Sequence, residues 1–163
     1  MISLDRTDLR LLAILQVAGR ITNAELAERV NLSASACLRR LQRLETDKVI
    51  RGYAARIEPK AVGLGLEAFV RVQLSKHEST AVAAFSELVN GWDEVTACHA
   101  LTGDMDYLLH VHVADLEDFS RFLLDHLLNA AGVADINSSF VLRTVKPPGS
   151  LPLSRLRVRG ATD

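Results

Sequence analysis

A short segment of the sequence combines serine, alanine and arginine in an order that suits contact with DNA. Arginines stand at positions 39, 40 and 43, and two serines and an alanine precede them. Guanidinium groups neutralise phosphates, and small side chains at the start of a helix can reach base edges in the major groove. The residues predicted to contact DNA are Ser33, Ser35, Ala36, Arg39, Arg40 and Arg43.

Three histidines, His99, His110 and His112, stand close together in the second half of the sequence. Such a group can bind a metal ion or serve acid–base chemistry. His110 and His112 would share one face of a strand, and we interpret them as strand-surface or interface residues. Cys37 and Cys98 are expected to be buried. Because no phosphate-binding loop or nucleophile motif is found, the sequence predicts no catalytic residue, no metal and no cofactor.

Residues 4–50 show the pattern of three helices, which would position the arginines. Apolar residues at helical spacing predict a first helix over residues 5–18. Thr22 and Glu25 have the spacing of a capping box, which predicts the start of a short second helix. Ser33 is expected to cap a third helix, whose apolar stripe leaves the arginines on the opposite face. This pattern indicates a helix-turn-helix; the alternative is a three-helix subdomain with a solvated charged face.

In the second half, apolar residues alternate at period 2, which is typical of strands. The predicted order is strand, helix, strand, strand, helix, strand, the arrangement of a ferredoxin-like α+β domain. Strands are expected over residues 68–74, 95–101, 107–113 and 136–145, and helices over residues 79–90 and 115–127. The two helices would cover one face of the sheet. Because apolar residues are expected on both faces, the uncovered face predicts a partner subunit.

Charge divides the chain, although its formal net charge is only −1. Residues 1–60 carry 11 basic and 7 acidic side chains, residues 61–145 carry 4 and 12, and residues 146–163 carry 4 and 1. The basic N-terminal part suits a polyanion, and the acidic part does not. Pro59 and nearby glycines mark a boundary.

The predicted domains are a helix-turn-helix domain at 1–52, an extended linker at 53–65, a βαββαβ domain at 66–146 and a basic tail at 147–163. The tail contains Arg155, Arg157 and Arg159 and is interpreted either as an edge strand or as a solvated segment.

Composition limits the class of protein. Of the 163 residues, 48% are hydrophobic and 24% are charged, a balance that can build a core and argues against global disorder. No apolar run approaches the roughly 18 residues that a membrane span needs. The first residues have no signal-peptide character, and two cysteines make no disulfide framework. The expectation is a reduced, cytoplasmic protein without a membrane partner.

Several short motifs follow one another along residues 4–146. In the first half they include Gly19-Arg20-Ile21-Thr22, Val30-Asn31-Leu32-Ser33 and the run from Ser35 to Glu45. In the second half they are Thr102-Gly103-Asp104-x-Asp106-Tyr107 and Phe140-Val141-Leu142. Together these motifs resemble the Lrp/AsnC family of transcription regulators. The sequence departs from that pattern at Asp47-Lys48, where a glycine is common, and at Met105, where an aromatic residue is common.

The resemblance implies a winged helix-turn-helix followed by a RAM-type sensing domain that forms dimers, which often assemble into octamers. It also implies a small effector, commonly an amino acid, held where dimers meet. Gly103 would let backbone N–H groups approach a carboxylate, and Asp104 or Asp106 could pair with an ammonium group. The implied effector residues are Thr102, Gly103, Asp104 and Asp106, with Ser138 and Ser139 added from a neighbouring subunit. The alternative is that Gly103-Asp104 is only a hairpin turn.

These observations predict a sequence-specific DNA-binding transcription regulator that responds to a small effector, and not an enzyme. Its expected partners are double-stranded DNA, an amino acid and further copies of the chain. Two alternatives stay open. One is an enzyme on the same scaffold, similar to the siroheme decarboxylases, against which an intact helix-turn-helix with an arginine-rich face argues. The other is a sensor module that does not bind DNA.

Overall fold

The structure is a computed structural model that describes residues 3–75, 79–153 and 156. The chain forms two compact units, one of residues 1–55 together with 146–163 and one of residues 56–145. None of the helices in the described ranges is long and apolar enough to cross a membrane.

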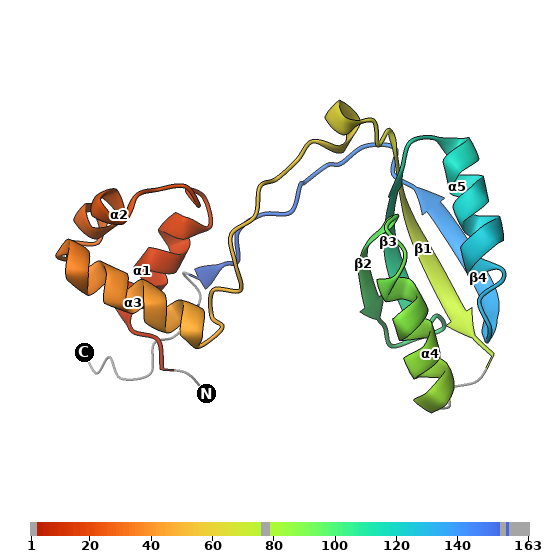
Figure 1. The fold of residues 1–163 in the computed structure, drawn as a ribbon, viewed down its shortest axis with the longest axis horizontal. Coiled ribbons are helices and arrows are strands. Elements are labelled where there is room, and N and C mark those ends of the chain that lie inside the picture. The colour runs from red at the N-terminus through yellow and green to blue at the C-terminus, as the bar shows by residue number, and fades with distance from the viewer. Residues whose placement is uncertain (1–2, 76–78, 154–155, 157–163) are drawn as a thin grey trace. The chain divides into compact units, whose positions relative to one another are not determined.

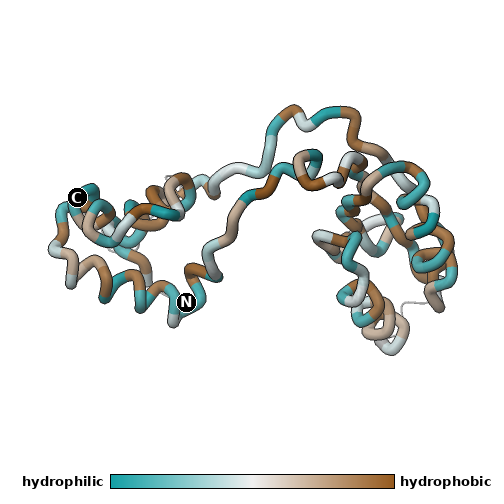
Figure 2. The backbone as a smooth tube through the Cα atoms, turned by 45° about the horizontal axis from the view of Figure 1, so that its top comes forward, coloured by the Kyte–Doolittle hydropathy of each residue, from teal (hydrophilic) through white to brown (hydrophobic). Residues whose placement is uncertain are grey.

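Three helices build the N-terminal unit: α1 at Arg6–Leu15, α2 at Asn23–Arg29 and α3 at Ala34–Thr46 (Figure 1). Each begins at a capping side chain. Asp5 and Asp8 form a reciprocal capping box on α1, and Thr22 and Glu25 form the predicted one on α2. The helices are amphipathic, as the alternation of teal and brown along them in Figure 2 shows. Their inner faces pack around Leu11, Leu26, Ala27, Val30 and Cys37.

The helix α3 ends in a Schellman motif at a residue that is not glycine. Lys48 has φ 57°, in the left-handed region. The Val49 N–H donates to the Leu44 carbonyl over 2.9 Å, and the Lys48 N–H donates to the Glu45 carbonyl over 3.0 Å. The departure from the family pattern at Asp47-Lys48 therefore leaves the shape of the helix exit intact and places a side chain where glycine is preferred.

The C-terminal tail belongs to the helical unit. The Leu151 N–H donates to Gln16 Oε1 over 2.6 Å, and Gln16 Nε2 donates back to the Leu151 carbonyl over 3.4 Å. The described residues of the tail, 146–153 and 156, accordingly group with the helices. The predicted alternation of Arg155, Arg157 and Arg159 lies outside the described residues.

The second unit is the predicted βαββαβ domain. Its elements are β1 at Leu66–Leu74, α4 at Ser79–Asn90, β2 at Val95–Ala100, β3 at Tyr107–Val113, α5 at Leu116–Phe122 and β4 at Val133–Phe140. A 3-10 turn at Pro59–Val62 precedes β1, and a π-helical turn at Leu123–Leu127 extends α5. The strands pair antiparallel in the order β2-β3-β1-β4. Figure 1 shows α4 and α5 on the same side of the sheet.

The last strand was expected over residues 136–145, and this boundary is wrong. β4 runs from Val133 to Phe140, and its final rungs pair Phe140 with Ala68 and the Val141 N–H with the Glu67 carbonyl. Because β1 begins at Leu66, only that residue remains to face the chain beyond Val141.

The core of this unit lies between the sheet and its helices. Alternate residues of β1 and β3 point to the helices and are buried, among them Val70, Val72, Tyr107, Leu109 and Val111. Phe85 on α4 and Phe122 on α5 pack on them, and Trp92 lies edge-to-face against both rings. This packing holds the central strands rigid.

No described helix covers the other face of the sheet, and that face is more polar than expected. It carries Glu67, Phe69, Arg71 and Gln73 from β1, Leu108, His110 and His112 from β3, and Asn137 and Ser139 from β4. The prediction that both faces are apolar is therefore only partly right: Phe69 and Leu108 lie on the uncovered face, whereas the buried apolar residues of β1 and β3 belong to the helix-facing side. Cys37 is buried as predicted, whereas Cys98, on the edge strand β2, is exposed.

Candidate nucleic-acid interface and effector site

The turn between α2 and α3 sets the direction of the third helix. Asn31 has φ 58°, and the Leu32 N–H after it donates to the Ala27 carbonyl over 2.9 Å. The Asn23 side-chain amide donates to the Ala34 carbonyl over 2.9 Å. These bonds join the start of α2 to the start of α3, as a helix-turn-helix requires.

Three of the predicted DNA-contacting residues lie in the first turn of α3. Ser33 is the N-cap and accepts a hydrogen bond from the Ala36 N–H at 3.3 Å, as predicted. Its hydroxyl lies 3.2 Å from that of Ser35, which is exposed, whereas Ala36 is half-buried. A small, exposed helix start of this kind can approach DNA closely.

Two of the three arginines are engaged inside the unit. Asp8 is completely buried, and its carboxylate accepts from Arg40 at 2.8 Å and from Arg43 at 2.5 Å. Arg40 also contacts Asp5 at 2.6 Å. Hydrogen bonds to Asp5 and Asp8 raise the pKa of Arg40 above its ordinary value. These two guanidinium groups therefore fasten α3 to the start of α1, a role that the sequence prediction missed.

Arg39 differs from its neighbours. Its side chain is exposed, and within the described part of the chain it makes no hydrogen bond or ion pair. It is the predicted arginine whose charge is open to an external anion.

The predicted effector loop joins β2 to β3. Gly103 has φ 120°, which strains any other residue, although nothing lies within 4 Å of where a Cβ would stand. Thr102, Gly103 and Asp104 are exposed. Open backbone and an exposed carboxylate are the features that an amino-acid ligand needs.

Asp106 has a structural part in this loop. Its carboxylate accepts from the Leu74 N–H at 2.7 Å, and its own N–H donates to the Val72 carbonyl at 2.9 Å. Gln73 Nε2 donates to the Asp104 carbonyl at 3.0 Å. The loop is thus held against the end of β1 rather than being a free hairpin tip.

The two predicted serines do not lie on one face. Ser138 pairs with Val70 and is half-buried on the helix side, whereas Ser139 pairs with Phe69 on the uncovered face. β4 is separated from β3 by β1, so a single subunit does not bring these serines beside the β2–β3 loop.

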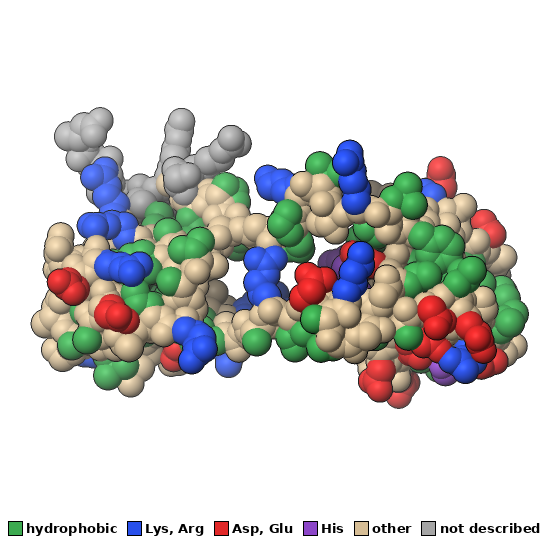
Figure 3. All heavy atoms as spheres, turned by 90° about the horizontal axis from the view of Figure 1, so that it is seen from above, with side chains coloured by type: hydrophobic (Ala, Val, Ile, Leu, Met, Phe, Trp, Pro, Cys, Tyr) green, Lys and Arg blue, Asp and Glu red, His purple; other side chains and the backbone are tan. Residues whose placement is uncertain are grey.

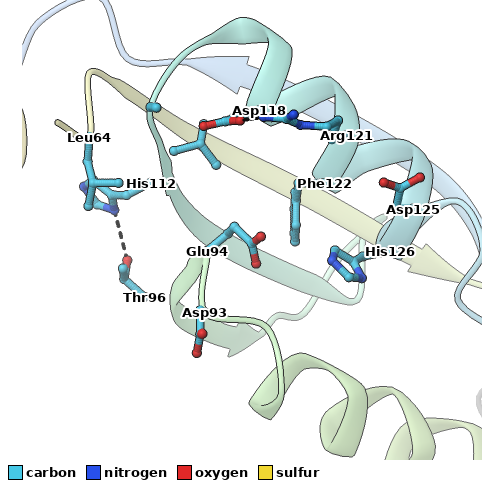
Figure 4. Close-up of a pocket in the computed structure, with 12 residues that line it drawn as sticks. Leu64, Asp93, Glu94, Thr96, His112, Asp118, Arg121, Phe122, Asp125 and His126 are labelled. Carbon is cyan, nitrogen blue, oxygen red and sulfur yellow. Dashed lines mark hydrogen bonds and ion pairs between the residues drawn. The ribbon is translucent and has the colours of Figure 1, made fainter.

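A separate groove of about 490 Å³ runs along α5 and the adjoining end of the sheet (Figure 4). Its polar lining includes Glu94, His126 and an ion pair between Asp118 and Arg121, and Phe122 lies among them. No residue of the predicted effector set lines it. Figure 3 likewise shows acidic side chains gathered on the C-terminal unit, in accord with the charge division of the sequence.

Two of the histidines are close to each other on the uncovered face. The rings of His110 and His112 have centroids 4.5 Å apart, and His110 Nε2 is 2.7 Å from Glu67 Oε1. Burial and the neighbouring His110 lower the pKa of His112, and Glu67 acts in the opposite sense. His99 lies on the edge strand and is exposed. Glu67 is 43 residues from His110 in the chain, so its part in this group was not predicted from the sequence.

A helix-turn-helix with an exposed arginine, in one chain with a βαββαβ domain, defines a DNA-binding regulator with a sensing domain. Residues 4–51 match the winged helix-turn-helix DNA-binding family model, and residues 67–151 match the Lrp/AsnC ligand binding domain. The chain belongs to the Lrp/AsnC family of transcriptional regulators.

Curated relatives agree over nearly the full chain. The Escherichia coli (strain K12) DNA-binding transcriptional activator DecR is 37% identical over 150 residues, covering 92% of this chain and 99% of the relative. The Bkd operon transcriptional regulator of Pseudomonas aeruginosa is 39% identical over 153 residues, which cover 94% of this chain and 100% of the relative.

Among solved structures, a transcriptional regulator of Neisseria meningitidis in complex with L-methionine is 49% identical, with a TM-score of 0.88 over 93% of this chain and 98% of that one. A feast or famine regulatory protein of Mycobacterium tuberculosis, also with L-methionine, is 33% identical, with a TM-score of 0.78 over 96% and 99%. The protein is a DNA-binding transcription regulator, as predicted. Its relatives are transcription regulators rather than enzymes, so the decarboxylase alternative is set aside.

Proposed function

We propose that the protein controls transcription in response to an amino acid, by binding DNA through α3 and the amino acid through the β2–β3 loop. The proposal that α3 binds DNA depends on one observation. Arg40 and Arg43 are paired with Asp8, whereas Arg39 is exposed. Because the protein binds DNA, we propose that it is located in the cytoplasm.

For the DNA interface we infer that Ser33, Ser35, Ala36 and Arg39 enter the major groove. Arg40 and Arg43 contribute by fixing the angle of α3, and they remain candidates for phosphate contacts because their side chains are 29% and 45% exposed.

The test is a fluorescence-anisotropy titration of operator DNA with wild type and Arg39→Ala. If Arg39 recognises a guanine, the variant should lose about 1–3 kcal/mol of binding free energy and lose preference at one base position. A phosphate contact would instead weaken all sequences alike. Arg6→Ala, a change in an exposed arginine at the start of α1, is the matched control. Unchanged affinity in Arg39→Ala would contradict the proposal.

For the effector we infer an amino acid at Thr102, Gly103 and Asp104, with Asp106 holding the loop. Support comes from the exposed carboxylate beside a glycine of positive φ, and from the L-methionine in the complexes of the Neisseria and Mycobacterium proteins. Ser138 and Ser139 would be supplied by a neighbouring subunit.

A thermal-shift screen of the twenty amino acids identifies the effector, because a ligand of the folded state stabilises it by about 2.7 kcal/mol at 100-fold excess over its Kd. Asp104→Ala should abolish that shift while leaving operator affinity within about three-fold. Asp135→Ala, an exposed aspartate on β4, is the control. If Asp104→Ala responds like the wild type, the effector binds elsewhere and the loop is only a turn.

A further inference from the structure

One group of side chains on the uncovered sheet face has the composition of a metal site. Glu67 on β1 and His110 and His112 on β3 each offer one ligand atom, and these three atoms lie within 4.8 Å of one another. The strand register explains the group. Glu67 pairs directly with His112, and His110 lies on the same face as His112 because side chains two residues apart in a strand point to the same side. Both strands are central in the sheet, so the backbone beneath the group is fixed.

The hydrogen bonds of Thr96 determine which nitrogen of His112 is free. The single hydroxyl proton of Thr96 is donated to the His110 carbonyl at 3.1 Å. Its oxygen, 3.2 Å from His112 Nδ1 in the contact drawn in Figure 4, must then accept a proton from that ring. Nδ1 carries the hydrogen, and Nε2 keeps the lone pair that a metal ion requires.

The other two side chains are also held in place. Phe69 stacks on the His110 ring with a centroid distance of 4.6 Å and an interplanar angle of 7°. Glu67 Oε1 lies 2.7 Å from His110 Nε2. All three side chains of the group are half-buried, which reduces competition from water.

We propose that Glu67, His110 and His112 bind one divalent transition-metal ion, with Zn²⁺ as the probe. Two imidazoles and one carboxylate suit Zn²⁺ and not Mg²⁺ or Ca²⁺, which take oxygen ligands. Bonds of about 2.0–2.2 Å in a tetrahedral site put ligand atoms roughly 3.3 Å apart. To reach this spacing Glu67 Oε1 and His110 Nε2, now 2.7 Å apart, must separate slightly, and the ligand atoms of a group that now extends to 4.8 Å must draw together by side-chain rotation. The group supplies three ligands, which leaves the fourth position to water or to a side chain of a second copy of the chain.

The site is tested by calorimetric titration of the EDTA-treated full chain with zinc sulfate. Wild type should bind one Zn²⁺ per chain. His112→Gln and Glu67→Gln should each weaken binding by more than about tenfold, and Thr96→Val, which frees the ring of His112, by about tenfold. His99→Gln, a histidine on the same sheet outside the group, should bind as the wild type does.

Folding is monitored separately by circular dichroism and thermal unfolding. The variants should melt like wild type without metal, and when Zn²⁺ is added wild type and His99→Gln should gain more melting temperature than Thr96→Val, His112→Gln or Glu67→Gln. Co²⁺ provides a second readout, because tetrahedral coordination gives visible absorption bands that His112→Gln should lose. The assignment is overturned if the wild type does not bind Zn²⁺, or if His112→Gln and Glu67→Gln bind Zn²⁺ as tightly as the wild type does. Since operator DNA is absent from these measurements, the result is independent of the proposed function.

Discussion

At the scale of single residues, three arginines of one helix differ in what they contact. Asp8 is buried with no exposed surface, and Arg40 and Arg43 are the cations that compensate its charge. Arg43→Ala should lower the free energy of unfolding by about 1–3 kcal/mol, since a buried carboxylate loses a charged donor. Arg39→Ala should change it by less than about 0.5 kcal/mol. Urea unfolding followed by circular dichroism measures both, and equal losses would show that Asp8 does not depend on Arg43.

The sequence could not separate these arginines, because their difference lies in contacts between distant residues. Helical periodicity places all three arginines on the polar side of α3. From the sequence, Asp8 could be predicted only as the residue that completes the capping box with Asp5. The ion pairs join residues 32 and 35 positions apart. The same limit applies to Glu67, whose approach to His110 depends on the pairing of β1 with β3.

At the scale of elements, the end of α3 carries a strain that can be removed. Lys48 occupies a left-handed conformation that disfavours an L side chain by roughly 1–2 kcal/mol. Lys48→Gly removes this strain, but glycine also has greater conformational freedom in the unfolded chain, which offsets part of the gain. The net stabilisation should be about 0.5–1 kcal/mol. Asn31→Gly, at the matching position after α2, should gain less, because asparagine tolerates this region. Equal gains in urea unfolding would contradict the explanation.

The start of α2 predicts a dependence on pH. Hydrogen bonds from the Thr22 backbone and hydroxyl lower the pKa of Glu25 below its ordinary value. A lowered folded-state pKa contributes stability that is present above the unfolded value of 4.5 and is lost as pH falls through the folded value. Wild type should therefore melt higher than Glu25→Gln at pH 7, and the difference should shrink below about pH 4.5. A difference that stays constant down to pH 3 would mean that the carboxylate charge is not what matters.

Element order could be predicted from the sequence, because periodicity and caps are local. Thr22, Ser33 and Asp115 all cap the helices that they were expected to begin. The end of β4 could not be predicted, because it depends on where β1 begins. The polarity of the uncovered face was misjudged for a related reason: alternation shows that two faces differ, and only strand pairing shows which residues share each face.

At the scale of the whole molecule, helix-turn-helix proteins commonly bind two DNA half-sites with two copies of the recognition helix, and we propose the uncovered sheet face as the contact between two copies of this chain. Phe69, 37% exposed, lies on that face beside Leu108 and the histidines. Such a face, apolar at its centre and polar around it, is typical of an interface between identical subunits.

If this face joins two subunits, Phe69→Glu should convert the protein to a monomer at micromolar concentration, because burying a carboxylate without a partner is costly. Leu124→Glu, which places the same charge at a 57% exposed position beyond α5, should remain at least dimeric. Light scattering coupled to size-exclusion chromatography distinguishes the two, and it also shows whether the wild type assembles further, toward an octamer. The monomer should bind operator DNA more weakly and with less discrimination, since each copy then finds its half-site alone. A wild type that is monomeric, or a Phe69→Glu variant that stays dimeric, places the contact on another surface.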